Sequence, residues 1–80
     1  MQIEIKLLTQ FKQYLPDPEL TGNTRVIEVE KDAAIEDALI SLGIPIDTPK
    51  VIMLNGRQTT LPTTLKEGDR LTVFPPVGGG

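Results

Sequence analysis

The chain has 80 residues, 39% of them hydrophobic and 24% charged, which predicts one small globular domain with a limited core. Its net charge is −3 and its eight Lys and Arg residues are scattered, so it lacks the basic surface that nucleic-acid binding requires. It has no cysteine and no histidine, which excludes disulfides, ordinary zinc sites and Cys–His or Ser–His nucleophile pairs; we expect no bound metal.

The first predicted element is a strand over residues 3–7, where apolar residues alternate with polar ones. This alternation differs from the continuous apolar core of a signal peptide, and no stretch has the length of a membrane span. We therefore expect a cytoplasmic protein with no membrane partner. Residues 9–23 contain Pro16, Pro18 and Gly22 and are predicted to form a loop.

A second predicted strand covers residues 25–30 and pairs with the first as a wide antiparallel hairpin. Ile27 and Val29 share one side, and Glu28 and Glu30 share the other. The two carboxylates therefore belong to a solvated face, and we assign them no catalytic role.

Apolar residues at helical spacing predict one amphipathic helix over residues 34–42. Asp32 is expected to cap its amino end, and Gly43 followed by Pro45 to end it. A short apolar strand, a tight turn at Asn55-Gly56 and another short strand should follow.

A second turn at Gly68-Asp69 leads into the last predicted strand, residues 70–74. The predicted order of elements is strand, strand, helix and then strands. This order predicts an α+β fold, a mixed sheet with one main helix packed on one face. We interpret this as the β-grasp, or ubiquitin-like, architecture. The domain is predicted to span residues 1–74, and residues 75–80 to form a tail.

The tail has the sequence PPVGGG. Proline lacks a backbone N–H, so Pro75 and Pro76 should end the sheet pairing and direct the chain away from it. Six extended residues reach about 20 Å at roughly 3.3 Å each, and glycines pass through narrow channels. The carboxylate of Gly80 would then enter the active site of a separate enzyme and attack the α-phosphate of ATP, giving an acyl-adenylate.

The segment LKEGDRLTVFPPVGGG resembles the end of the small subunit of molybdopterin synthase and of related ubiquitin-like sulfur carriers, the MoaD/ThiS family. The likeness covers the whole chain. The strand and turn of that family resemble VIMLNGRQT, its helix resembles AIEDALISLGIP, and its opening strand resembles MQIEIKLLTQFKQYLP. The tail motif is the part of this resemblance that is most specific to the family.

The resemblance implies a protein co-substrate rather than an enzyme. An E1-like activating enzyme would adenylate Gly80 and convert it to a thiocarboxylate, which donates sulfur to a small-molecule acceptor. Gly79 completes the diglycine, and Pro75, Pro76 and Val77 guide the tail. Gly78 departs from the alanine or serine usual in relatives, which adds flexibility. The chain has no phosphate-binding loop, so ATP belongs to the partner and we expect no bound cofactor.

Biosynthesis of molybdopterin, for the molybdenum or tungsten cofactor, is the pathway that the resemblance favours, with a large synthase subunit as second partner. FKQYLPDPELTG departs from the dedicated synthase subunit, however, so the acceptor stays open. Thiamine-pathway carriers usually lack the Pro-Pro pair. Two other classes of function also stay open. One is a modifier conjugated to lysines through Gly80, and the other is an interaction module with an inert tail.

Phe74 and Met53 are candidate docking residues beside the tail. If Leu71 and Val73 point into the core, Phe74 points outward, and Met53 points outward if Ile52 points inward. An apolar patch at this position would suit an activating enzyme or a large synthase subunit.

Overall fold

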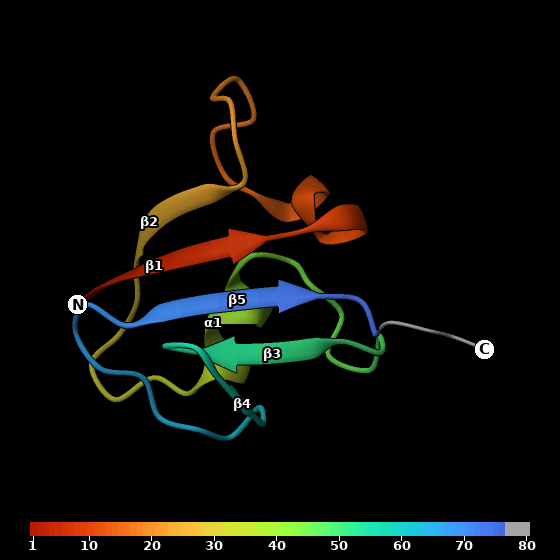
Figure 1. The fold of residues 1–80 in the computed structure, drawn as a ribbon. Helices are drawn as coiled ribbons and strands as arrows, with labels where there is room; N and C mark the ends of the chain where they lie inside the picture. The colour runs from red at the N-terminus through yellow and green to blue at the C-terminus, as the bar shows by residue number, and fades with distance from the viewer. Residues whose placement is uncertain (77–80) are drawn as a thin grey trace.

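The structure is a computed structural model that describes residues 1–76. Five strands in this range form one mixed sheet in the order β2-β1-β5-β3-β4, and Figure 1 shows the helix α1 behind it. The elements, in chain order, are β1 (Gln2–Leu7), the 3-10 helix η1 (Thr9–Tyr14), β2 (Thr24–Glu28), α1 (Ile35–Ser41), β3 (Val51–Leu54), β4 (Arg57–Thr59) and β5 (Arg70–Phe74). The predicted fold class is confirmed.

The central strands β1 and β5 run parallel, and the other neighbouring strands pair antiparallel, including the predicted hairpin of β1 and β2. Within β1 and β5, alternate side chains face α1 and are almost fully buried, as the alternation in the sequence predicts. Side chains from the sheet, η1 and α1 form one core, whose largest fully buried members are Ile3, Ile5, Leu7, Phe11, Ile35, Leu39, Leu65, Leu71 and Val73.

Residues 9–14 form the 3-10 helix η1, so the loop predicted there is wrong over this part. The backbone N–H of Phe11 donates to the carbonyl of Leu8 at 3.1 Å, and the side chain of Phe11 is buried. Helical periodicity in a sequence needs several buried residues at regular spacing, and η1 has only one. That residue holds the turn through contacts with distant parts of the chain. Pattern reasoning therefore missed η1.

The amino end of α1 is fixed by backbone carbonyls, so the cap predicted at Asp32 is wrong. The N-cap position is Ala34, and Asp32 lies in the turn before it with a φ of 66°. The N–H groups of Ile35 and Glu36 donate to the carbonyls of Thr63 and Leu61 at 2.9 and 3.0 Å. A distant segment therefore accepts from these first N–H groups of the helix. In many helices a side chain at the N-cap position does so instead.

The two predicted turns, Asn55-Gly56 and Gly68-Asp69, are joined by a side-chain contact. Asn55 and Gly56 both have positive φ values, as a tight hairpin turn requires. The Asn55 amide donates to Asp69 at 2.9 Å, and its Oδ1 accepts from the N–H of Arg70 at 2.8 Å. The contact fixes the start of β5 against the end of β3.

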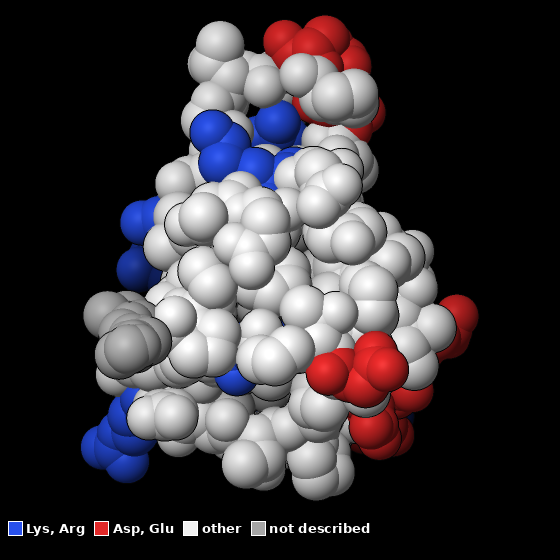
Figure 2. All heavy atoms as spheres, turned by 90° about the vertical axis from the view of Figure 1, so that its right-hand side faces the viewer, with Lys and Arg blue, Asp and Glu red and all other residues white. Residues whose placement is uncertain are grey.

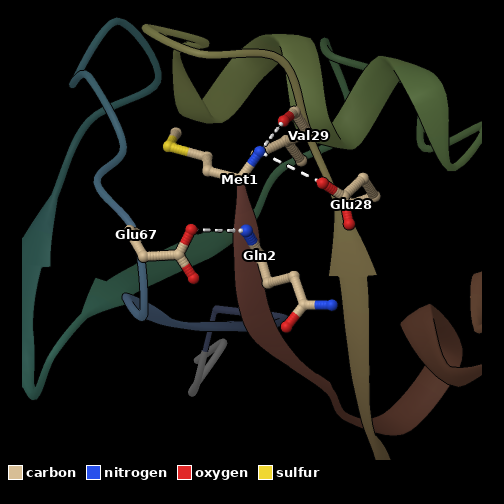
Figure 3. A network of polar contacts seen from close by, with 5 residues as sticks. All are labelled: Met1, Gln2, Glu28, Val29 and Glu67. Atoms are coloured by element: carbon tan, nitrogen blue, oxygen red, sulfur yellow. Dashed lines mark hydrogen bonds and ion pairs between the residues drawn. The ribbon is translucent and has the colours of Figure 1, made fainter.

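The first residues of β1 are held on both sides by polar contacts (Figure 3). The Met1 ammonium donates to the Val29 carbonyl at 2.8 Å and to Glu28 Oε2 at 3.2 Å. The N–H of Gln2 donates to Glu67 Oε1 at 3.0 Å. These contacts fix β1 between the end of β2 and the turn that precedes β5.

Arg25 has a buried charged side chain, although it stands in β2 on the same side as Ile27. Its guanidinium donates at 2.8 to 3.5 Å to carbonyls of the preceding loop and of the first residue of β2, those of Pro16, Asp17, Leu20, Thr21 and Thr24. In Figure 1 this loop projects beyond the start of β2. One side chain therefore organises the projecting loop through hydrogen bonds to its backbone.

We expect Arg25→Met to lower the free energy of unfolding by about 2–3 kcal/mol, because several carbonyls lose a charged donor at once. Urea denaturation measures the loss. Arg70→Met is the matched control: Arg70 is exposed and lies 4.0 Å from Glu4, so its loss should cost less than about 1 kcal/mol. Equal effects of the two substitutions would contradict the role given to Arg25.

Candidate functional site

The predicted tail begins where β5 ends, at Phe74, between β1 and β3. Pro75 is half-buried and Pro76 is exposed, and neither is in a strand. Since proline has no backbone N–H to donate, the end of sheet pairing at this point agrees with the sequence. The other tail residues to which a role was assigned, Val77, Gly78, Gly79 and Gly80, lie outside the described residues.

Phe74 and Met53 lie on the face of the sheet opposite α1, as predicted. Phe74 pairs with Val51 across β5 and β3, and Met53 pairs with Thr72. Their neighbours along the strands, among them Ile52 and Val73, are buried in the core. Phe74 and Met53 are half-buried, so each keeps surface that a partner can contact. Their docking role stays a prediction.

Two further apolar residues extend this surface, and we call Leu8, Val51, Met53 and Phe74 the apolar patch. Leu8 has extended backbone angles and follows the inward-facing Leu7, so its side chain turns to the outer face. Its N–H donates to the Val73 carbonyl at 3.0 Å, which places it beside the end of β5. Sequence reasoning missed Leu8 because the pairing of β1 with β5 joins the two ends of the chain.

The segment leading into β3 is fixed by Lys50, which precedes Val51. The Lys50 ammonium donates to the carbonyls of Ile46 and Thr48. Burial lowers the pKa of Lys50, and the Asp47 carboxylate acts in the opposite direction. This contact stabilises the segment beside the end of β5, since Val51 pairs with Phe74.

Charged residues lie beside the patch on the outer face. Lys6 pairs with Thr72 in the β1–β5 register and is exposed, and Glu4 and Arg70 form an ion pair at 4.0 Å further along the same face. Figure 2 views the end of the molecule where β5 ends. Its centre is mostly uncharged, Lys and Arg atoms lie mainly on the left and upper part, and Asp and Glu atoms at the right and top.

The described part of the chain offers no metal centre: residues 1–76 contain no group of three His, Cys, Asp or Glu side chains placed to hold an ion. A surface hollow between the end of β2 and α1 includes none of the patch residues. Across the same residues, no helix has the length and apolar character needed to cross a bilayer. The described candidate site is thus a surface beside the start of the tail.

Comparison with solved structures shows the same fold over nearly the full length of several chains. SAMP1 from Haloferax volcanii matches with a TM-score of 0.74 and 24% identity, covering 100% of both chains. A Pyrococcus furiosus protein described as a candidate subunit 1 of molybdopterin converting factor matches with a TM-score of 0.72 and 23% identity, over 95% of this chain and 98% of that one.

A third match comes from the protein complex of subunits 1 and 2 of molybdopterin-converting factor from Helicobacter pylori, with a TM-score of 0.58, 24% identity and 100% of both chains covered. No curated protein matches the sequence. The model of the ThiS family matches residues 16–80, which include the whole predicted tail. The chain is therefore a member of the ThiS family, with the β-grasp fold of its structural neighbours.

Proposed function

We propose that this chain is a sulfur carrier that works through the carboxylate of Gly80. The observation that carries the proposal is the position of the tail: β5 ends in the middle of the sheet at Phe74, beside an apolar patch, and Pro75 and Pro76 follow. The match to the ThiS family continues through Gly80, so the proposed reactive end belongs to the matched sequence.

The proposed chemistry has two steps, both performed in a separate activating enzyme. The Gly80 carboxylate attacks the α-phosphate of ATP, forming an acyl-adenylate and releasing pyrophosphate. Sulfide from a sulfur donor then attacks the acyl carbon, the C–S bond forms as the bond to AMP breaks, and a thiocarboxylate results. The α-carboxyl group has an ordinary pKa of about 3.3–3.7, so it is already ionised at neutral pH. The chain supplies the acyl group, and its partner supplies ATP and catalysis.

The apolar patch is the proposed contact with that enzyme. Partly exposed apolar side chains at the centre of an interface give much of its binding energy, and Phe74 and Met53 are such residues beside the tail. Lys6 would face an acidic group on the enzyme. Docking would then hold the start of the tail at a fixed place, from which Gly79 and Gly80 reach the nucleotide.

We propose that the sulfur is used in molybdopterin synthesis, where a precursor of molybdopterin accepts it, with a large synthase subunit as a second partner. The support is the tail motif and the structural likeness to subunit 1 in the Helicobacter pylori complex. In this proposal the chain is the small subunit of a synthase and remains a co-substrate. A cytoplasmic location, where ATP is present, belongs to the same proposal.

A second candidate function is a ubiquitin-like modifier, favoured by the likeness to SAMP1, which is also described as small archaeal modifier protein 1. In this function a lysine amine of another protein displaces AMP from the adenylated Gly80 and forms an isopeptide bond.

One experiment separates the two candidate functions. The chain is incubated with activating enzyme, ATP and a sulfur donor, with and without a mixture of acceptor proteins. The carrier function predicts that the free chain gains sulfur in both reactions. The modifier function predicts conjugates that form only with acceptor proteins and disappear when Gly79 and Gly80 are deleted. An unchanged chain and no conjugates, with an enzyme shown to bind the chain, would leave an interaction module.

A further inference from the structure

The strand β2 has one edge that no other part of the described chain pairs with. β2 is an edge strand of the sheet, and Figure 1 shows it at the margin beyond β1. The N–H of Val29 donates to the Met1 carbonyl at 2.8 Å, and the N–H of Leu7 donates to Asn23 at 3.0 Å. In an antiparallel pair such bonded positions alternate, so the odd-numbered residues of β2 bond to β1.

The even-numbered residues Thr24, Val26 and Glu28 therefore direct their backbone groups away from the sheet. The Thr24 carbonyl accepts from Arg25 at 2.8 Å. Within residues 1–76, no hydrogen bond is found for the outward backbone groups of Val26 and Glu28. Val26 is 64% exposed. An edge strand of this kind offers donors and acceptors to an added strand.

The far end of this edge is acidic. Within the described chain, a hollow between the end of β2 and α1 is lined by four acidic residues, Glu28, Glu30, Asp32 and Asp37. Two positive groups in this part of the chain also line it, Lys31 and the Met1 ammonium, and the ammonium pairs with Glu28 at 3.2 Å. The start of β2 is flanked by the loop that Arg25 organises, which projects past the strand. An incoming segment thus finds free backbone groups at Val26 and Glu28 and carboxylates beside them.

We propose that the outward edge of β2 is a docking site for an extended, basic segment of a partner protein. The segment adds to the sheet as a further strand through the backbone of Val26 and Glu28. Its Lys or Arg side chains lie beside the acidic residues at the end of β2. The backbone bonds give affinity, and the charges select a basic sequence.

A second copy of this chain fits the edge less well than a basic segment does. Antiparallel pairing of two β2 strands around Val26 sets the Glu28 end of each beside the Thr24 end of the other. Next to Thr24 lies the loop that carries Asp17 and Glu19, so carboxylates would face carboxylates. The net charge of −3 adds to this repulsion.

The proposed docking site is separate from the tail. β1 runs parallel to β5 and antiparallel to β2, so Glu28 lies at the end of the sheet opposite Phe74. The chain can therefore hold a basic segment at β2 while an enzyme engages the tail. This makes the inference independent of the proposed function, and deleting Gly79 and Gly80 should leave it unchanged.

The test is amide hydrogen exchange, followed by NMR, with a short acetylated peptide of alternating lysine and valine. We expect the peptide to slow exchange at Val26 and Glu28 and to leave Arg25 and Ile27 unchanged, since these already bond to β1. This alternation is specific to strand addition, because a peptide held only by charge would not produce it.

Two controls complete the experiment. A peptide with the same lysines but with prolines in place of valines keeps the charge and cannot pair as a strand, so it should give no alternating protection. Replacing Glu28 and Glu30 by Gln should raise the Kd of the lysine–valine peptide about three- to tenfold, whereas Glu4→Gln with Glu67→Gln should change it little. Equal binding of both peptides, or no protection at Val26 and Glu28 at millimolar peptide, would overturn the proposal.

Discussion

Deletion of Gly79 and Gly80 is expected to abolish activation of the chain while leaving its stability within about 0.5 kcal/mol of the full-length value. The carboxylate would then end on Gly78, two residues short, and each residue of an extended chain spans roughly 3.3 Å. Such a displacement removes the nucleophile from the α-phosphate of ATP, and misplacement of about 1 Å alone can cost a hundredfold in rate. Pyrophosphate release measures activation, and urea denaturation measures stability.

The matched control is Gly78→Ala, which keeps the length of the tail. Alanine adds only one methyl group, so we expect pyrophosphate release within about threefold of the unmodified rate, a difference of less than about 1 kcal/mol in transition-state free energy. If the deletion variant were activated as fast as the full chain, Gly80 would not be the reacting residue.

Phe74→Asp is expected to lower kcat/KM for activation by about ten- to a hundredfold, the loss typical of a central apolar interface residue. Phe74 lies beside the start of the tail on the outer face and is half-buried, so its loss removes the middle of the apolar patch. A carboxylate there would also meet the acidic margin that we expect on the enzyme opposite Lys6. The measurement is pyrophosphate release at several concentrations of the chain.

Val26→Asp is the matched control for Phe74→Asp. Val26 is on the same face and is more exposed, but it lies on β2, two strands away from β5. We expect this variant to be activated at the normal rate. Equal losses for both variants would show that the charge, and not the patch, determines the effect; no loss for either would place docking elsewhere on the molecule.

Local patterns predicted most of the fold. Alternation identified β1 and β2, helical spacing identified α1, and Asn55-Gly56 predicted the hairpin of β3 and β4. The helix cap at Asp32 was wrong because carbonyls from the segment after β4 satisfy the first N–H groups of α1. Contacts of that kind join residues far apart in sequence, and no local pattern records them.

The candidate site was also predicted in part from local patterns. Alternation placed Phe74 and Met53 on the outer face, and the strand register confirms that placement. Leu8 and Val51 were missed, since their positions depend on how β1 and β3 pair with β5. Arg25 was missed as well: a charged residue at an inward position is explained only by the loop carbonyls that surround it. The proposed roles of the tail residues rest on the sequence.

The most direct test of the sulfur-carrier proposal is an intact mass spectrum of the chain after incubation with activating enzyme, ATP and a sulfur donor. The account predicts a mass gain equal to replacing one oxygen by sulfur, localised to Gly80 by fragmentation and absent from the variant that lacks Gly79 and Gly80. An unchanged mass with an enzyme that binds the chain and hydrolyses ATP would contradict the account, as would sulfur found on any other residue.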